Sequence, residues 1–250
     1  MSTAVMTGRL PEVSPRLKAR IAGLLYLIVI AGGMFAEIFV RGKLVVQGDP
    51  AATARNILAH ESLYRWGFAV EAFYCACVIP LTFIFYDLFK IVNKSVAAVE
   101  VMFSLTGNAV ESVSLLAFFA PLVLLGGGRS LGALPPEQLQ AAAYVSLKLF
   151  EYGFAICLVF FGFDCLLSGY LIIKSTFFPR IIGVLLAIEG VCYLINSFAN
   201  FVAPRFAERF FSVLAVSAIG EFSLCLWLLV MGVNEQRWKE QAGILGFANN

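Results

Sequence analysis

Residues 95–125 read SVAAVEVMFSLTGNAVESVSLLAFFAPLVLL. This stretch contains no lysine, arginine or histidine, and its only acidic residues are Glu100 and Glu111. It is longer than the roughly 20 apolar residues that a helix needs to cross the hydrocarbon core of a bilayer. A run of this length and composition is typical of a transmembrane helix rather than of a helix in a water-soluble domain.

Similar runs on both sides of this stretch predict six transmembrane helices. Their predicted ranges are 21–40, 66–89, 95–125, 141–173, 181–203 and 210–233. The composition agrees, because 60% of the 250 residues are apolar and 14% are charged, against about 25% charged in a soluble domain. We therefore predict an all-α, polytopic transmembrane bundle over residues 20–233, with an N-terminal tail at 1–19 and a C-terminal tail at 234–250.

The first connection between predicted spans carries a helix signal of its own. Asp49 is a good N-cap residue, and Pro50 follows at the first helical position. Alanine-rich sequence then continues to Glu61. We expect a short interfacial helix in this first outer loop.

The basic residues predict the orientation of the bundle. Of the 18 lysine and arginine residues, ten lie in the two tails and in the second and fourth connections, which leaves eight elsewhere. Basic residues collect on the cytoplasmic side of membrane proteins, so we expect both termini in the cytoplasm. With a net charge of +2 and no cationic face, we expect the lipid bilayer, and not nucleic acid, as the partner.

Acidic residues inside the predicted spans are the main functional signal. Glu37, Asp87 and Glu100 stand near span ends, where we expect them to reach the headgroups. Six others lie deeper: Glu71, Glu111, Glu151, Asp164, Glu189 and Glu221. Each costs about 2.5–3.5 kcal/mol if it faces lipid at the centre of a helix. We therefore expect these six to face one another, other polar groups or water.

Helical spacing gathers several of these acids into stripes. Residues three or four apart share one face of a helix. The stripes consist of Glu100, Ser104, Asn108 and Glu111 in the third span, Glu189, Tyr193, Asn196 and Asn200 in the fifth, and Ser217 and Glu221 in the sixth. In the fourth span Glu151 and Asp164 lie far apart around the helix, and Lys148, one turn before Glu151, predicts an ion pair.

These stripes predict a polar cavity near the membrane midplane. Its candidate lining residues are Glu111, Glu189, Glu221, Asn108 and Asn196, with Glu71 and Asp164 as further binding candidates. Such a cavity suits a cation, a proton or a small polar solute. The alternative is a structural or partner-binding subunit, in which the same groups only bond helix to helix.

An enzyme is the less favoured class. A serine nucleophile needs a base such as histidine, and the only histidine, His60, lies outside the spans. Asp87 and Asp164 are distantly similar to a paired-aspartate protease site, but Phe163 stands where that motif has glycine. The six cysteines all lie in apolar runs, so we expect no disulfide and no metal centre. We also expect no cofactor and no catalytic residue.

Four segments resemble one family of bacterial integral membrane proteins, the domain of unknown function 4386. They are Arg20 to Ile28, Gly48 to Glu61, Phe160 to Leu171 and Phe178 to Leu186. The resemblance extends over residues 18–203 and implies a multi-pass fold in the bacterial inner membrane, with no established activity. The family often has arginine where this chain has Ser104, and histidine where it has Glu151 and Asp164. The resemblance therefore implies no shared site for this chain, and its own carboxyls are the more conspicuous.

Overall fold

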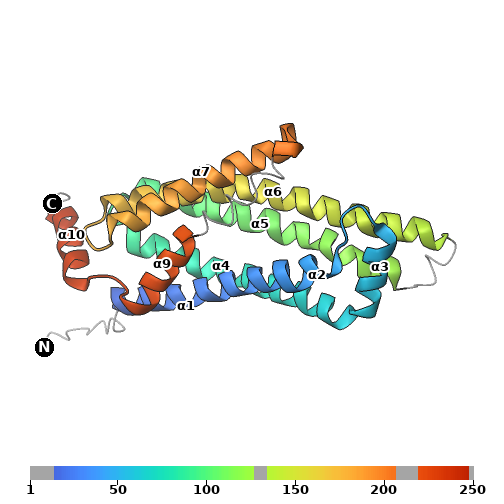
Figure 1. Cartoon of the computed structure of the whole chain (residues 1–250). Helices are drawn as coiled ribbons and strands as arrows, with labels where there is room; N and C mark the ends of the chain where they lie inside the picture. The colour runs from blue at the N-terminus through green and yellow to red at the C-terminus, as the bar shows by residue number, and fades with distance from the viewer. Residues whose placement is uncertain (1–13, 127–133, 207–218, 248–250) are drawn as a thin grey trace, which may run out of the picture.

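The computed structural model describes residues 14–126, 134–206 and 219–247, and all regular structure within them is helical. The helices are α1 (Pro15–Met34), the π-helix η1 (Phe35–Arg41), α2 (Gly42–Leu44), α3 (Pro50–Ala59), α4 (Glu61–Phe89), α5 (Lys94–Leu125), α6 (Pro136–Lys174), α7 (Arg180–Val202), α9 (Ile219–Val230) and α10 (Glu235–Phe247). The long helices lie side by side in an elongated bundle, with α3 near one end and α10 at the other (Figure 1). We call these the α3 end and the α10 end.

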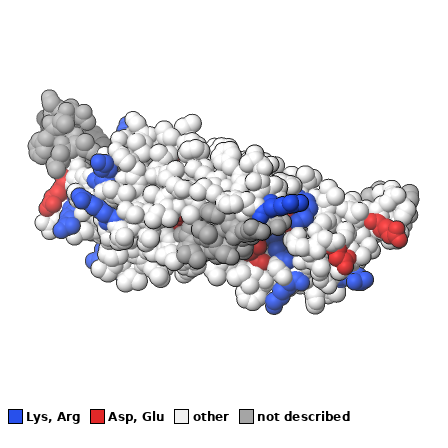
Figure 2. Space-filling model, turned by 45° about the horizontal axis from the view of Figure 1, so that its top comes forward, with Lys and Arg blue, Asp and Glu red and all other residues white. Residues whose placement is uncertain are grey.

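Five helical runs have the length and composition of membrane spans. They are Pro15–Leu44, α4, α5, α6 and α7. The sixth predicted span, 210–233, falls partly outside the described residues, and its described part is the shorter apolar helix α9. On the face shown in Figure 2, most of the lysine, arginine, aspartate and glutamate among the described residues lies toward the two ends, and white, uncharged residues cover much of the surface between them. This distribution is that of a membrane protein.

Local capping sets where several helices begin. Asn93 accepts a hydrogen bond from the amide of Val96 at 3.1 Å and so starts α5 directly after the turn that follows α4. Asp49 accepts one from the amide of Ala52 at 2.8 Å, with Pro50 as the first residue of α3. The helix predicted in the first connection is therefore present, and its place at the membrane interface remains a prediction.

Glycine brings α6 and α7 into backbone contact. A Cβ atom added at Gly183 would lie 2.6 Å from the carbonyl oxygen of Gly169, and one added at Gly190 would lie 2.6 Å from that of Gly162. At these distances there is no room for a side chain between the α6 carbonyl oxygen and the backbone of α7. Small residues at such crossings let membrane helices pack closely, so these four glycines fix the spacing of α6 and α7.

The buried apolar side chains form two clusters, and most of the buried polar residues of α5 and α6 lie between them. On α5 the α10-end cluster contains Ala97, and the α3-end cluster contains Leu115 and Phe118. On α6 the α3-end cluster contains Phe150, and the α10-end cluster contains Leu171. The intervening segments of both helices hold polar residues. The polar interior is thus closed by apolar packing at each end.

Three boundaries differ from the sequence expectation. Helix α1 begins at Pro15, inside the expected N-terminal tail, because Ser14 caps it through the amide of Leu17. The first helical run continues to Leu44, so that Arg41 lies in the helix and not in a loop. The expected C-terminal tail contains α10, whose Trp238 Nε1 donates to the carbonyl oxygen of Leu88 at 3.0 Å. Residues 1–13 and 248–250 of the two tails lie outside the described residues.

Candidate functional site

One face of α5 carries a row of polar side chains inside the bundle. The row consists of Glu100, Ser104, Asn108 and Glu111, whose exposed fractions are 2%, 6%, 6% and 4%. The spacing of four, four and three residues keeps them on one face of the helix. We call this set the α5 row. It supplies a continuous line of polar atoms between the two apolar clusters.

Helix α4 meets the α3-end of the row. The hydroxyl of Tyr74 donates to Glu111 Oε1 at 2.5 Å, with both groups buried. One turn earlier on α4, Glu71 is completely buried and forms an ion pair with Arg41. Arg41 also bonds Glu37, with 2.7 Å between Nε and Oε2. Two acids and one arginine thus cap this end of the polar interior.

Arg41 is held inside the bundle by aromatic rings as well as by carboxylates. Its Cζ atom lies 5.7 Å from the centroid of the Phe118 ring and 5.0 Å from that of Phe150. These are cation–π distances. Arg41 is the last residue of η1, and π-helical segments recur at functional sites in other proteins. Its side chain is only 14% exposed.

Helix α6 meets the opposite end of the row. Ser168 Oγ donates to Glu100 Oε1 at 3.2 Å, and the Asp164 carboxyl, one turn earlier on α6, interacts with that of Glu100. The expectation that Glu100 reaches the headgroups is wrong. It is buried because α5 begins at Lys94, more than one turn before it, and α6 covers that face. Between these ends, Ser104 shares a 3.0 Å hydrogen bond with Thr82 of α4.

A second carboxyl pair joins α7 to α9. Tyr193 OH donates to Glu189 Oε1 at 3.2 Å and lies 3.3 Å from Glu221 Oε1. The backbone amide of Glu221 donates to Glu189 Oε2 at 2.9 Å. A Cβ atom at Gly220 would lie 2.6 Å from that same oxygen and 3.0 Å from the backbone carbonyl of Leu185, so α9 passes close to α7 at this glycine. Cys165 Sγ completes a group in which all ligand atoms lie within 4.8 Å of one another.

Three buried oxygen atoms in this interior have no hydrogen-bond partner within the described residues. They are Glu71 Oε2, Asn108 Oδ1 and Asp164 Oδ1. Asn108 belongs to the α5 row, Asp164 interacts with Glu100 at one end of it, and Glu71 lies one turn before Tyr74, which bonds Glu111 at the other end. Because buried polar atoms in proteins are nearly always paired, such orphans indicate a water, an ion or a proton that completes the site.

The structure distributes the predicted site residues over neighbouring contacts instead of one set of direct bonds. Glu189 accepts a hydrogen bond from the backbone amide of Glu221, whereas Glu111 accepts one from the hydroxyl of Tyr74. Asn196 is buried, 6% exposed, on the α7 face that holds Glu189 and Tyr193. The groups therefore form separate sets of hydrogen bonds within one interior. Ser217, predicted to share a stripe with Glu221, lies outside the described residues.

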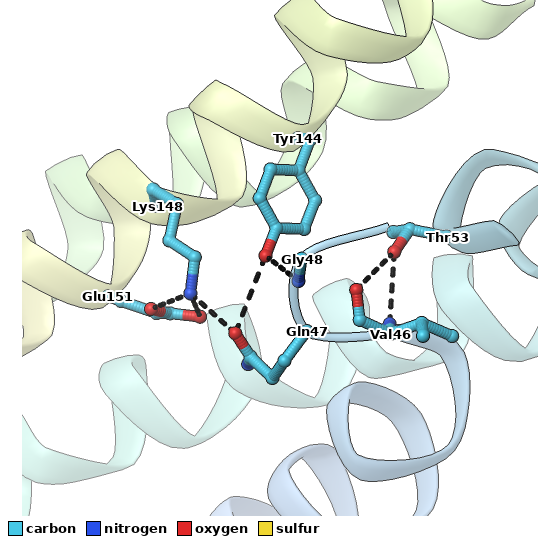
Figure 3. Close-up of polar contacts among 7 residues, drawn as sticks. All are labelled: Val46, Gln47, Gly48, Thr53, Tyr144, Lys148 and Glu151. Atoms are coloured by element: carbon cyan, nitrogen blue, oxygen red, sulfur yellow. Dashed lines mark hydrogen bonds and ion pairs between the residues drawn. The ribbon is translucent and has the colours of Figure 1, made fainter. Parts of the chain in front are cut away.

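Lys148 and Glu151 lie apart from this interior, near the α3 end. Lys148 Nζ is 2.8 Å from Glu151 Oε2 and also donates to Gln47 Oε1 at 2.7 Å (Figure 3). In the same view Tyr144 OH accepts from the amide of Gly48 at 2.7 Å. Lys148 and Tyr144 therefore tie α6 to the connection before α3. Glu151, expected among the deep acids, has a side chain that is 44% exposed.

Sequence reasoning missed three partners of the buried acids. Arg41 was assigned to a loop, and Tyr74 and Cys165 were given no role. A signal for Tyr74 existed, because it lies three residues after Glu71 and so shares its helix face. No comparable signal existed for Cys165, since its neighbours come from two other helices.

The fold and this interior define a class: an all-helical membrane protein whose buried core contains carboxyl groups. Within that class, the family model described as a domain of unknown function (DUF4386) matches residues 21–232, and the chain belongs to this family. No curated protein and no solved structure matches the chain.

Proposed function

We propose that this protein binds or moves a small cation, protons included, through the polar interior of its bundle, in a bacterial inner membrane with both termini in the cytoplasm. The observation that carries the proposal is the set of orphan oxygens, Glu71 Oε2, Asn108 Oδ1 and Asp164 Oδ1, arranged along and beside the α5 row. A water, a proton or a hard cation can complete such acceptors, and a proton or a cation also balances the charge of the carboxyls.

The charge balance of the interior supports the same conclusion. Among the described residues, the ion pairs engage Glu37, Glu61, Glu71, Asp87 and Glu151. None of these pairs reaches Glu100, Glu111, Asp164, Glu189 or Glu221. An isolated carboxylate is costly within the membrane. Within the described residues no lysine or arginine forms an ion pair with these five groups, which supports a proton or a bound cation as the balancing charge.

The hydrogen bonds of the interior bear on the size of the ligand. Tyr74 bonds Glu111 at 2.5 Å, Ser168 bonds Glu100 at 3.2 Å and Tyr193 bonds Glu189 at 3.2 Å. Carboxyl oxygens bonded in this way can hold a proton or a small ion, which supports such a ligand over a larger polar solute.

Flux into liposomes tests the proposal. Purified protein is reconstituted with a pH-sensitive dye, or with a sodium-sensitive dye, inside the vesicles, and a potassium diffusion potential drives entry. We expect a cation or proton influx that Glu111→Gln abolishes, because Gln keeps the shape and removes the charge. Glu151→Gln is the matched control, since this acid is exposed and outside the row, and it should leave the flux unchanged.

Ligand-dependent stability separates cations from protons. A ligand that binds only the folded state stabilises it by about 2.7 kcal/mol at a hundredfold excess over Kd. A saturable rise in Tm with sodium, potassium or calcium that is absent in Glu111→Gln identifies a metal cation. If wild type shows neither flux nor a selective shift, and Glu111→Gln is as stable as wild type, the carboxyls only hold helices together. The structural or partner-binding alternative then takes the place of our proposal.

A further inference from the structure

An apolar groove runs along the surface between α4 and α5 and does not belong to the polar interior. Its volume is about 410 Å³, and it is lined by Ile79, Thr82, Phe83 and Tyr86 of α4 and by Ala98, Val101 and Leu105 of α5. Ile79 and Phe83 are 56% and 66% exposed. The Thr82 hydroxyl already shares a hydrogen bond with Ser104, so the groove offers hydrocarbon contact and little else.

The groove extends from the middle of the bundle toward the α10 end. Seven residues separate Ile79 from Tyr86, which is a rise of roughly 10 Å along a helix. One leaflet of the hydrocarbon core is roughly 15 Å deep, half of the full thickness. The groove therefore matches most of one leaflet, the depth that a single acyl chain occupies.

Positive charge stands at the α10-end mouth of the groove. Lys90 follows Tyr86 by one turn, with Nζ 5.9 Å from the centroid of the Tyr86 ring. Lys94 precedes Ala98 by one turn at the start of α5. The local acid is Asp87, which Lys18 and Lys90 already share. Three ammonium groups against one carboxylate leave two net positive charges.

We propose that this groove is a specific site for an anionic phospholipid, with one acyl chain along α4 and α5 and the phosphate at Lys90 and Lys94. The net positive mouth selects a headgroup with net negative charge, because the ammonium of a zwitterionic headgroup meets lysines of the same sign. The start of α5 adds the partial positive charge of a helix N-terminus at the same level. This inference does not depend on the proposed function.

Direct lipid binding to the full chain in detergent tests the site. The probes are dioleoyl phosphatidylglycerol and dioleoyl phosphatidylcholine, followed by native mass spectrometry across a lipid titration. We expect one phosphatidylglycerol per chain to bind selectively. Each lysine removed, as Lys90→Gln or Lys94→Gln, should weaken binding about fivefold. Leu105→Trp, which fills the groove, should prevent it.

Matched controls separate this site from general lipid contact. Lys174→Gln removes a lysine at the same end with the same geometry, since its Nζ lies 6.0 Å from the Tyr170 ring centroid. Leu116→Trp adds the same bulk to α5 at a position that is 71% exposed and away from the groove. Both should bind like wild type. If Leu105→Trp lowers the Tm of the lipid-free protein, Ala98→Leu replaces it as the groove-filling variant.

Three outcomes would overturn the proposal. The first is equal binding of phosphatidylglycerol and phosphatidylcholine. The second is an equal loss of binding in Lys174→Gln and Lys94→Gln. The third is binding of glycerol 3-phosphate as tight as that of the lipid, because it would show that the groove contributes nothing.

Discussion

At the residue scale, the buried Arg41–Glu71 pair is the feature with the largest predicted effect on stability. Glu71 is fully buried, and Arg41 is enclosed by Phe118 and Phe150. Removing one partner of a buried pair leaves an uncompensated charge. We expect Glu71→Gln to lower the free energy of unfolding by about 3–5 kcal/mol. Detergent denaturation in mixed micelles, followed by circular dichroism, measures this change.

A double variant identifies the cause. Arg41→Met combined with Glu71→Leu removes both charges and should be less destabilising than Glu71→Gln alone. If the losses of unfolding free energy in Arg41→Met and Glu71→Leu add up to the loss in the double variant, the pair does not interact. Lys148→Gln is the exposed comparison, because the side chains of its ion pair are 34% and 44% exposed, and it should cost no more than about 1 kcal/mol.

The Tyr193 hydroxyl makes a second residue-scale prediction. It bridges Glu189 and Glu221, and so links α7 to α9. Tyr193→Phe keeps the ring and removes the bridge. We expect a loss of about 0.6–1.7 kcal/mol, the range of side-chain hydrogen bonds between membrane helices, in the same denaturation assay. Tyr152→Phe on the half-exposed face of α6 is the control and should be neutral.

At the element scale, the contact of α6 with α7 depends on glycine. Alanine at Gly183 or Gly190 places a methyl group 2.6 Å from a backbone carbonyl oxygen of α6, so the helices must separate. Overpacking of this kind costs about 1–3 kcal/mol. Thermal unfolding in detergent should show lower Tm values for Gly183→Ala and Gly190→Ala.

Gly33 provides the control within the same chain. A Cβ atom there meets nothing within 4 Å, and Gly33 lies inside α1. Replacing glycine by alanine in an uncrowded helix interior stabilises it by about 0.5–1 kcal/mol. Gly33→Ala should therefore be neutral or stabilising. A drop in Tm equal to that of Gly190→Ala would mean that close approach is not the reason for glycine in α7.

At the scale of the whole molecule, the bundle presents opposite ends to opposite sides of the membrane. Arg55 is exposed on α3, and Lys174 is exposed at the end of α6. The six native cysteines are all buried, so new ones should give a clear signal. A membrane-impermeant maleimide should label Arg55→Cys in intact cells and Lys174→Cys only after permeabilisation. The reverse pattern would place both termini outside.

The predicted helices of the bundle follow from the sequence to a large extent. The five long apolar helices correspond to predicted spans, and the α5 row was visible in the spacing of Glu100, Ser104, Asn108 and Glu111. Apolar run length and residue periodicity are local properties that a sequence records directly. The end of the first span was less well predicted. The apolar run stops before Arg41, so hydropathy ends the span there, whereas the helix continues through the π-helical segment that contains this charged residue.

The site was predicted as a set of residues and not as a set of contacts. The sequence identified the acids and their helix faces. It did not identify Arg41 as the partner of Glu71, Tyr74 as the partner of Glu111, or Asp164 as the partner of Glu100. These pairs join residues on different helices, so they depend on the relative rotation and register of helices that the sequence treats one at a time.

The apolar runs were enough to predict long helices suited to a membrane, because hydrocarbon leaves the backbone no alternative to internal hydrogen bonds. They were also enough to predict that the deep acids face polar partners, since a lone carboxylate in lipid is too costly. Only the folded bundle shows which acid pairs with an arginine, which bonds a tyrosine and which oxygens of the described residues stay unpaired. The reason is physical: pairing depends on side chains brought within about 3 Å across helix interfaces, and close glycine contacts such as Gly169 with Gly183 set those interfaces.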